Sequence, residues 1–214
     1  MASKSDIVQA LLDRHGQTFC DELGIAIERN EPAPLFQWLV ASNLFSTQIG
    51  FEHGAQAAKD LFDAGLTTPR RMFDSQWKNR VRILNEAGYA RMDEKYATYL
   101  RKMSGQLIER YDGDLRRLRE AAGKKREDEI ARLKQFDGIS KSGASIFCRE
   151  VQAVWHELYP FADDKALQAA RTLGLGADVW TLADLVDTED FPRLVAALVR
   201  ADLQNDLDAI RDAA

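Results

Sequence analysis

The stretch that decides the fold reads Leu133-Lys-Gln-Phe-Asp-Gly-Ile-Ser-Lys-Ser-Gly-Ala-Ser-Ile-Phe147. Apolar residues recur at helical spacing on both sides of Gly138. They are Ile130, Leu133 and Phe136 before it, and Ala144, Phe147, Val151, Val154 and Leu158 after it. Gly138 can adopt the left-handed conformation that ends a helix, and Ser140 or Ser142 can cap the next one. The pattern predicts two helices and a tight turn over about residues 130–158, with backbone N–H groups that could bind a phosphate.

Helical periodicity continues along nearly the whole chain, and no strand pattern, nucleotide-binding glycine pattern or metal-binding histidine pair occurs. Residues 35–45 are apolar on nearly all sides, which is typical of a helix in the centre of a bundle. Pro32 and Pro34 precede this segment and mark a lobe boundary. Further helices are expected over Asp93–Tyr111, Trp180–Val186 and Phe191–Ile210. The sequence therefore predicts an all-α fold.

The charge of the chain is unevenly distributed. The net charge is −5, but residues 66–149 carry 20 basic and 12 acidic groups. A polarised chain of this kind can present a positive face to phosphate while its ends stay acidic. The N-terminus lacks an apolar signal region, and no run of about 18 apolar residues occurs, so we expect a cytoplasmic protein that does not enter a membrane. Cys20 and Cys148 lie within apolar helical patterns and are expected to be buried thiols.

Two adjacent acids, Asp163 and Asp164, stand 25 and 26 residues after Gly138 and directly before a helix predicted to begin near Lys165. Either could cap that helix, which is the commoner use of Asp at such a position. A carboxylate held in such a place can also stabilise positive charge that develops during a reaction. The acids are therefore candidates for a cap, a catalyst, or both.

Leu133, Gly138-Ile139, Ser142 and Ala144 resemble the helix-hairpin-helix motif of the endonuclease III superfamily of DNA glycosylases. Other segments in register are Pro34 with Leu44, Ser46 and Gln48, then Thr68-Pro-Arg-Arg-Met72, Asn85-Glu-Ala-Gly-Tyr89 with Lys95-Tyr96, and Asp163 with Leu173-Gly-Leu175. The chain departs from the family pattern at Phe136-Asp137, Ser140, Gly50-Phe51, Gln168 and Thr172. The resemblance extends from about Pro34 to Leu175.

The resemblance implies a two-lobed helical fold with the active site in the cleft between the lobes. Residues 31–150 would form the lobe with the hairpin, and residues 1–30 with 151–214 a second, discontinuous lobe. It implies a monomeric base-excision repair enzyme that flips a damaged or mispaired base out of double-stranded DNA and hydrolyses its N-glycosidic bond. Asp163 would be the catalytic carboxylate, with Asp164 as the alternative. The residues expected to contact DNA are Gln48, which would fill the gap left by the flipped base, and Gly138, Ile139, Ser140, Lys141, Ser142 and Gly143.

One position in the hairpin bears on whether the protein would also cut the DNA strand. Family members that also cut the strand use a hairpin Lys to form a Schiff base, and Ser142 stands at that position. Lys141 lies one position earlier, which is about 100° away around a helix. We therefore expect a monofunctional glycosylase. The alternatives are a bifunctional glycosylase and lyase that uses Lys141 or Lys165, and a non-catalytic DNA-binding protein.

An iron–sulfur cluster needs four cysteines and the chain has two, so no cofactor or structural metal is expected, although a monovalent cation could bind at the hairpin.

Overall fold

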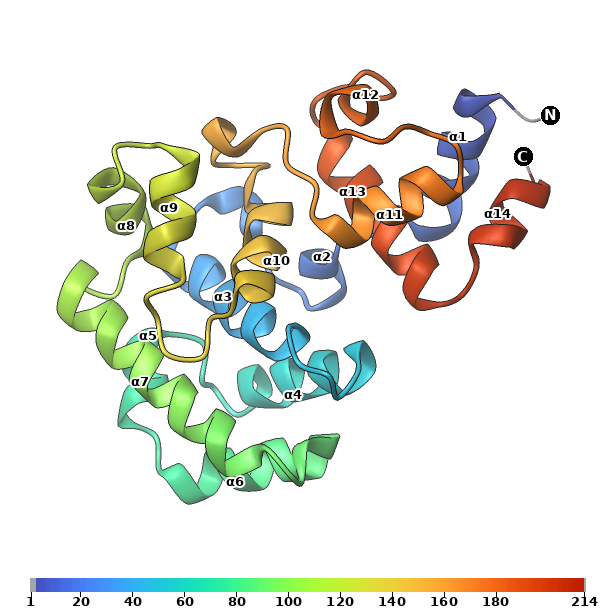
Figure 1. The fold of residues 1–214 in the computed structure, drawn as a ribbon. Coiled ribbons are helices and arrows are strands. Elements are labelled where there is room, and N and C mark those ends of the chain that lie inside the picture. Colours follow the sequence, from blue (N-terminus) through green and yellow to red (C-terminus); the bar gives the residue numbers. More distant parts are fainter. Residues whose placement is uncertain (1–2, 214) are drawn as a thin grey trace. The chain divides into compact units, whose positions relative to one another are not determined.

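The computed structural model describes residues 3–213, in which helices are joined by turns and no strand occurs (Figure 1). The predicted all-α class is confirmed. The chain divides into two compact units: unit 1 comprises the described parts of Met1–Gly24 and Cys148–Ala214, and unit 2 comprises Ile25–Phe147. The division expected from the sequence placed these boundaries after residues 30 and 150.

Unit 2 is organised around α3 (Pro32–Phe45), which lies between α4 and the start of α10 in Figure 1. Nearly every residue of α3 from Pro34 to Leu44 is buried, as predicted for a helix that is apolar on all sides. The other elements of this unit are η1 (Ile27–Arg29), α4 (Phe51–Asp63), α5 (Pro69–Asp74), α6 (Trp77–Leu84), η2 (Asn85–Tyr89), α7 (Asp93–Tyr111), α8 (Leu115–Ala121), α9 (Arg126–Leu133) and the first part of α10 (Lys141–Val151). The predicted bounds of α7 are confirmed.

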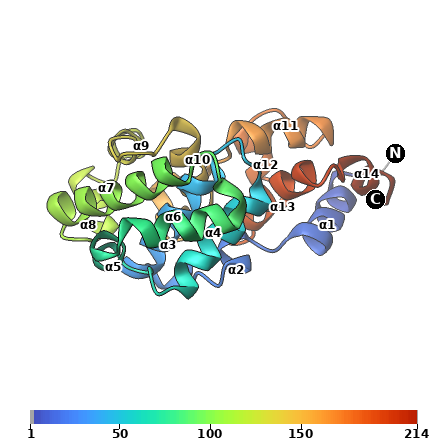
Figure 2. The ribbon, with the colours of Figure 1, turned by 90° about the horizontal axis from the view of Figure 1, so that it is seen from below.

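The long helix α7 is the second support of unit 2, and α5 and α6 pack along it (Figure 2). The buried Arg80 of α6 ties these three helices together. Its Nε donates to Ala97 O at 2.9 Å and its Nη1 to Ser75 O at 2.6 Å. One of the basic residues counted in the middle of the chain is therefore a core group and contributes no exposed positive surface.

Unit 1 packs α1 (Lys4–His15) and α11 (Asp164–Thr172) against α13 (Phe191–Leu203), whose alanine-rich middle is fully buried. Its other elements are α2 (Phe19–Glu22), η3 (His156–Leu158), α12 (Val179–Ala183) and α14 (Leu207–Ala213). None of the helices described in either unit is both long enough and apolar enough to cross a bilayer.

The single helix predicted over Phe191–Ile210 is wrong. α13 ends at Leu203, and Asn205 takes a left-handed conformation with φ 55°. The N–H of Asp206 then donates back to Ala201 O at 2.8 Å, which closes the helix with a C-terminal turn of the kind usually built on Gly. Asp206 also accepts from Arg14 Nε at 2.9 Å, so the break is fixed to α1. The helix predicted over Trp180–Val186 is shorter and ends at Ala183.

Candidate nucleic-acid interface and carboxylate site

The turn between α9 and α10 has the conformation that the sequence predicts. Gly138 has φ 87°, in the left-handed region. Ser140 is the capping residue of the two candidates: its Oγ accepts from Gly143 N at 3.1 Å, and its carbonyl accepts from Ala144 N at 3.0 Å. The N–H groups of Lys141 and Ser142 precede the first helical hydrogen bond, so they form the open end of an eleven-residue helix.

Residues 138–143 differ in what they offer to a ligand. The side chains of Ser140, Lys141 and Ser142 are exposed. Ile139 is buried, and its N–H donates to Phe136 O at 3.1 Å. Gly143 is also buried, with its N–H bonded to Ser140. Within this turn, Ser140, Lys141 and Ser142 are therefore the residues whose side chains could contact a nucleic acid.

The 138–143 turn is supported by a side chain of α7, through the residue that precedes Gly138. Gln106 on α7 pairs with Asp137 in both directions, since its Oε1 accepts from Asp137 N and its Nε2 donates to Asp137 Oδ2, each at 2.8 Å. This pairing gives a structural role to Asp137, which is one of the positions where the chain departs from the family pattern. Nothing in the local sequence reveals it, because Gln106 lies 31 residues away.

Gly138 also packs closely against the side chains of Asn43 on α3 and Tyr99 on α7. A Cβ added there would come within 2.7 Å of Asn43 Nδ2 and 3.0 Å of the Tyr99 side chain. Asn43 is fully buried, and its amide has no hydrogen-bond partner among residues 3–213. The turn thus requires Gly138 for both its conformation and its lack of a side chain.

Gln48 is exposed in the turn between α3 and α4. Tyr89 supports this turn from the core: its hydroxyl donates to Leu44 O at 2.8 Å and lies 3.2 Å from Thr47 Oγ1. Burial raises the pKa of Tyr89 to about 12, so it stays a hydrogen-bond donor. A Cβ on Gly143 would lie 3.5 Å from Ser46 Oγ, which places the start of the Gln48 turn beside the first turn of α10. Unit 2 therefore brings these two predicted DNA contacts together.

Asp163 lies in unit 1, where it caps α11. Its Oδ1 accepts from Ala166 N at 3.0 Å, and its Oδ2 pairs with Arg149 Nη1 at 2.9 Å. The exposed fractions of these two side chains are 10% and 4%. Asp164, by contrast, is exposed as the first residue of α11. The capping role expected for one of the acids belongs to Asp163, and the two acids have different surroundings.

Sequence reasoning missed Arg149 and its neighbours at the end of α10. Gln152 pairs with Phe161 in both directions, since its Nε2 donates to Phe161 O and its Oε1 accepts from Phe161 N, each at 2.8 Å. The buried Glu150 accepts from Phe19 N at 2.7 Å and Cys20 N at 2.8 Å. Burial raises the pKa of Glu150, with Arg149 and these hydrogen bonds opposing it. The available signal was the charged pair Arg149-Glu150 at the end of a helix, between the apolar residues Cys148 and Val151.

Other candidate groups lie elsewhere or are part of the core. Lys165 Nζ pairs with Asp202 Oδ2 on α13 at 3.0 Å, while Lys141 is exposed at the start of α10. The aromatic side chains of Trp38, Tyr89 and Trp155 are fully buried and are part of the core. Cys20 and Cys148 are buried thiols, as predicted. Within residues 3–213 no three His, Cys, Asp or Glu side chains are grouped to hold a metal ion.

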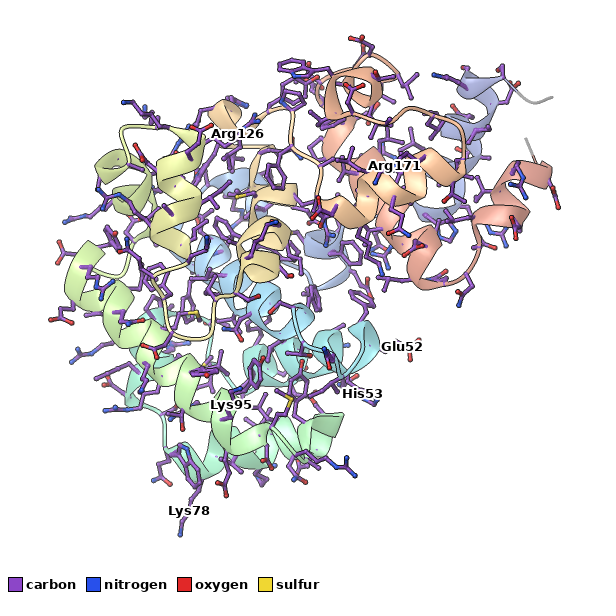
Figure 3. All side chains as sticks on the ribbon, viewed as in Figure 1. Glu52, His53, Lys78, Lys95, Arg126 and Arg171 are labelled. Atoms are coloured by element: carbon purple, nitrogen blue, oxygen red, sulfur yellow. The ribbon has the colours of Figure 1, made fainter. Side chains whose placement is uncertain are left out.

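The two units differ in charge. Unit 2 has 21 basic and 17 acidic residues, whereas unit 1 has 8 and 17. Part of the positive charge of unit 2 is paired locally, as in Arg82 with Glu86 and Arg116 with Asp114. Other basic side chains are exposed, and Figure 3 shows Lys78 extending away from the helices of this unit. The positive excess lies in the unit that contains the 138–143 turn.

No family model and no curated protein matches the chain. Two solved structures share its fold. One is a trapped covalent intermediate of endonuclease III with DNA, described as an estranged-adenine complex, with a TM-score of 0.52. The other is a non-covalent endonuclease III–DNA complex, with a TM-score of 0.51. In both cases the identity is 17%, and the match covers 94% of this chain and 86% of the other. The chain therefore has an endonuclease III-like fold.

Proposed function

We propose that this protein is a DNA base-excision glycosylase that flips a damaged or mispaired base out of double-stranded DNA and hydrolyses its N-glycosidic bond. One observation carries the proposal. Asp163 combines a nearly buried carboxylate, two fixed hydrogen-bond donors and a position at the start of α11, within a fold shared with an enzyme solved in complexes with DNA. Asp164 is exposed and has none of this support.

The chemistry requires a carboxylate close to the sugar. As the base departs, positive charge develops on the sugar ring, and a carboxylate with a fixed orientation stabilises that charge without having to reorganise. Each Asp163 oxygen accepts one hydrogen bond, which leaves lone pairs on both for a sugar or a water molecule. We assign the catalytic role to Asp163.

Binding would use the start of α10 and the turn that contains Gln48. The first-turn N–H groups of Lys141 and Ser142 could donate hydrogen bonds to a phosphate, and the helix dipole favours negative charge there. Gln48 is exposed two residues after Ser46, which lies beside the first turn of α10, so its amide could enter the space of a flipped base while that turn binds the backbone. A monovalent cation at the turn would serve the same phosphate contact.

We further propose that the enzyme leaves the DNA strand intact. A lyase step needs a neutral amine beside the sugar, whereas the cation that pairs with Asp163 is an arginine, which stays protonated. Ser142 has no amine, and Lys165 is paired with Asp202. These contacts support a monofunctional glycosylase over the bifunctional alternative.

The test is a screen of duplex oligonucleotides that each carry one damaged or mispaired base, with Asp163→Asn as the inactive control. Wild type should release a base from at least one duplex and leave an abasic site that breaks only in alkali. Borohydride should trap little covalent complex. Efficient trapping that disappears in Lys141→Ala or Lys165→Ala would establish the bifunctional alternative.

One contact favours a second candidate function, a non-catalytic DNA-binding protein. The positive charge of Arg149 partly neutralises the negative charge of Asp163, and a carboxylate neutralised in this way is a weaker electrostatic catalyst. The same screen separates the candidates. DNA binding without base release from any duplex would favour the binder.

A further inference from the structure

The candidate catalytic segment is held at two points, by the last turn of α10 and by the residue that follows this helix. Arg149 and Gln152 are three positions apart, so they project from the same side of the helix end. Gln152 fixes the backbone of Phe161 with two hydrogen bonds of 2.8 Å, and Arg149 fixes the Asp163 side chain at 2.9 Å. The segment 161–163 therefore reaches the start of α11 with its backbone and its carboxylate both constrained.

Arg149 is itself held in place. Its guanidinium carbon lies 4.8 Å from the centre of the Phe19 ring, and the backbone N–H of Phe19 donates to Glu150, the next residue of α10. With only 4% of its side chain exposed, Arg149 has little freedom to follow a moving partner. A rigid, planar and permanently charged donor sets the direction of the carboxylate that it binds.

Building on the role proposed above for Asp163, we infer that Arg149 is a positioning residue for base excision. It donates to Oδ2 while the helix amide of Ala166 donates to Oδ1. The two donors together fix the rotation of the carboxylate and hence the direction of its remaining lone pairs. Arg149 does not need to touch the DNA to do this. Its partner is Asp163, and its effect belongs to the chemical step more than to binding.

The test uses Arg149→Lys, which keeps the charge but loses the planar fork, and Arg149→Gln, which loses the charge. Single-turnover base release at saturating enzyme should fall on the order of tenfold or more in Arg149→Lys and further in Arg149→Gln, because a shift of about 1 Å near the reacting atoms can cost about a hundredfold. The DNA dissociation constant should stay within about twofold of wild type, because the lost interaction acts in the transition state.

Arg200→Lys is the matched control. Arg200 is also nearly buried and its guanidinium lies 4.4 Å from the same Phe19 ring, but it pairs with Glu22 and does not contact Asp163. We expect wild-type base release in this variant. Equal losses in the Arg149 and Arg200 variants would reduce the effect to general packing and overturn the inference.

A second readout keeps the inference testable if a variant is poorly stable or excision fails. The Ala166 amide proton bonds to Asp163 Oδ1, so its hydrogen exchange, followed by NMR, reports whether the carboxylate is in place. Exchange should accelerate at Ala166 in both Arg149 variants and stay unchanged in Arg200→Lys. Unchanged exchange in a folded Arg149→Gln protein would overturn the positioning role. Wild-type excision by Asp163→Asn would instead overturn the proposed function, whatever the exchange result.

Discussion

The starts of α10 and α11 are both capped helix ends, but they are capped in opposite ways. α10 begins with the neutral Ser140 and exposed side chains, whereas α11 begins with the charged Asp163, which is nearly buried and paired with Arg149. A serine cap leaves the positive end of the helix dipole free for an external anion, and an aspartate cap satisfies that end from within. The same kind of position, the N-cap of a helix, thus serves two purposes. The start of α10 can attract phosphate, and the start of α11 holds a carboxylate.

The largest effect is expected when the charge at the start of α11 is removed. Asp163→Asn keeps an oxygen for Ala166 but loses the negative charge, so single-turnover excision should fall on the order of a hundredfold or more. Leaving Arg149 with a weaker partner should also lower stability, by up to about 3 kcal/mol. A thermal melt of the same preparation separates the two effects. Wild-type excision by a folded Asp163→Asn protein would exclude Asp163 from the mechanism.

Much of this contrast could be predicted from the sequence, because it depends on local signals. Glycine at 138, a serine two residues later and an acid directly before a helix are readable from neighbouring residues, and α7 was predicted to the residue. The supports could not be predicted in the same way. Gln106 reaches Asp137 across 31 residues, and Arg149 reaches Asp163 from an earlier helix, so these contacts exist only once the helices have packed.

The same limit explains the error at the C-terminal end. The apolar spacing of Phe191–Ile210 fits one long helix, because α13 and α14 each continue the pattern. The break depends on Asn205 in a left-handed conformation and on Asp206 held by α1. Asn is a weaker helix-ending signal than Gly, so periodicity alone favoured the longer helix.

The second largest effect is expected when Ser140→Asp makes the start of α10 resemble that of α11. Ser140→Asp retains a good N-cap, so stability should change by less than about 1 kcal/mol. The added negative charge should repel phosphate and weaken DNA binding by roughly tenfold at low salt, with a smaller difference at high salt. Titrations at two salt concentrations measure this, and Ser140→Asn is the neutral control. Equal affinities for the Asp and Asn variants would mean that DNA does not approach this helix end.

A smaller effect is expected from distorting the turn while its charges are kept. Gly138→Ala places a Cβ against Asn43 and Tyr99 at positive φ, which should cost roughly 1–2 kcal/mol of stability and weaken DNA binding a few-fold without regard to sequence. Gly123→Ala is the matched control, because Gly123 also has positive φ but has no atom within 4 Å of an added Cβ. If both variants bind DNA like wild type after correction for folded fraction, the 138–143 turn is not the anchor.

The smallest effect is expected at the neighbouring acid, and it tests whether the role proposed for the cap belongs to Asp163 alone. Asp164 follows the cap and is exposed, so Asp164→Asn removes only a favourable charge near the helix dipole, worth less than about 1 kcal/mol. Base release should stay within about twofold of wild type, because the direction of the Asp163 carboxylate does not depend on its neighbour. The measurement is single-turnover excision on the duplex identified by the screen, beside Asp163→Asn. A selective loss of excision in Asp164→Asn would move the catalytic role by one residue and reduce the Asp163–Arg149 pair to a structural contact.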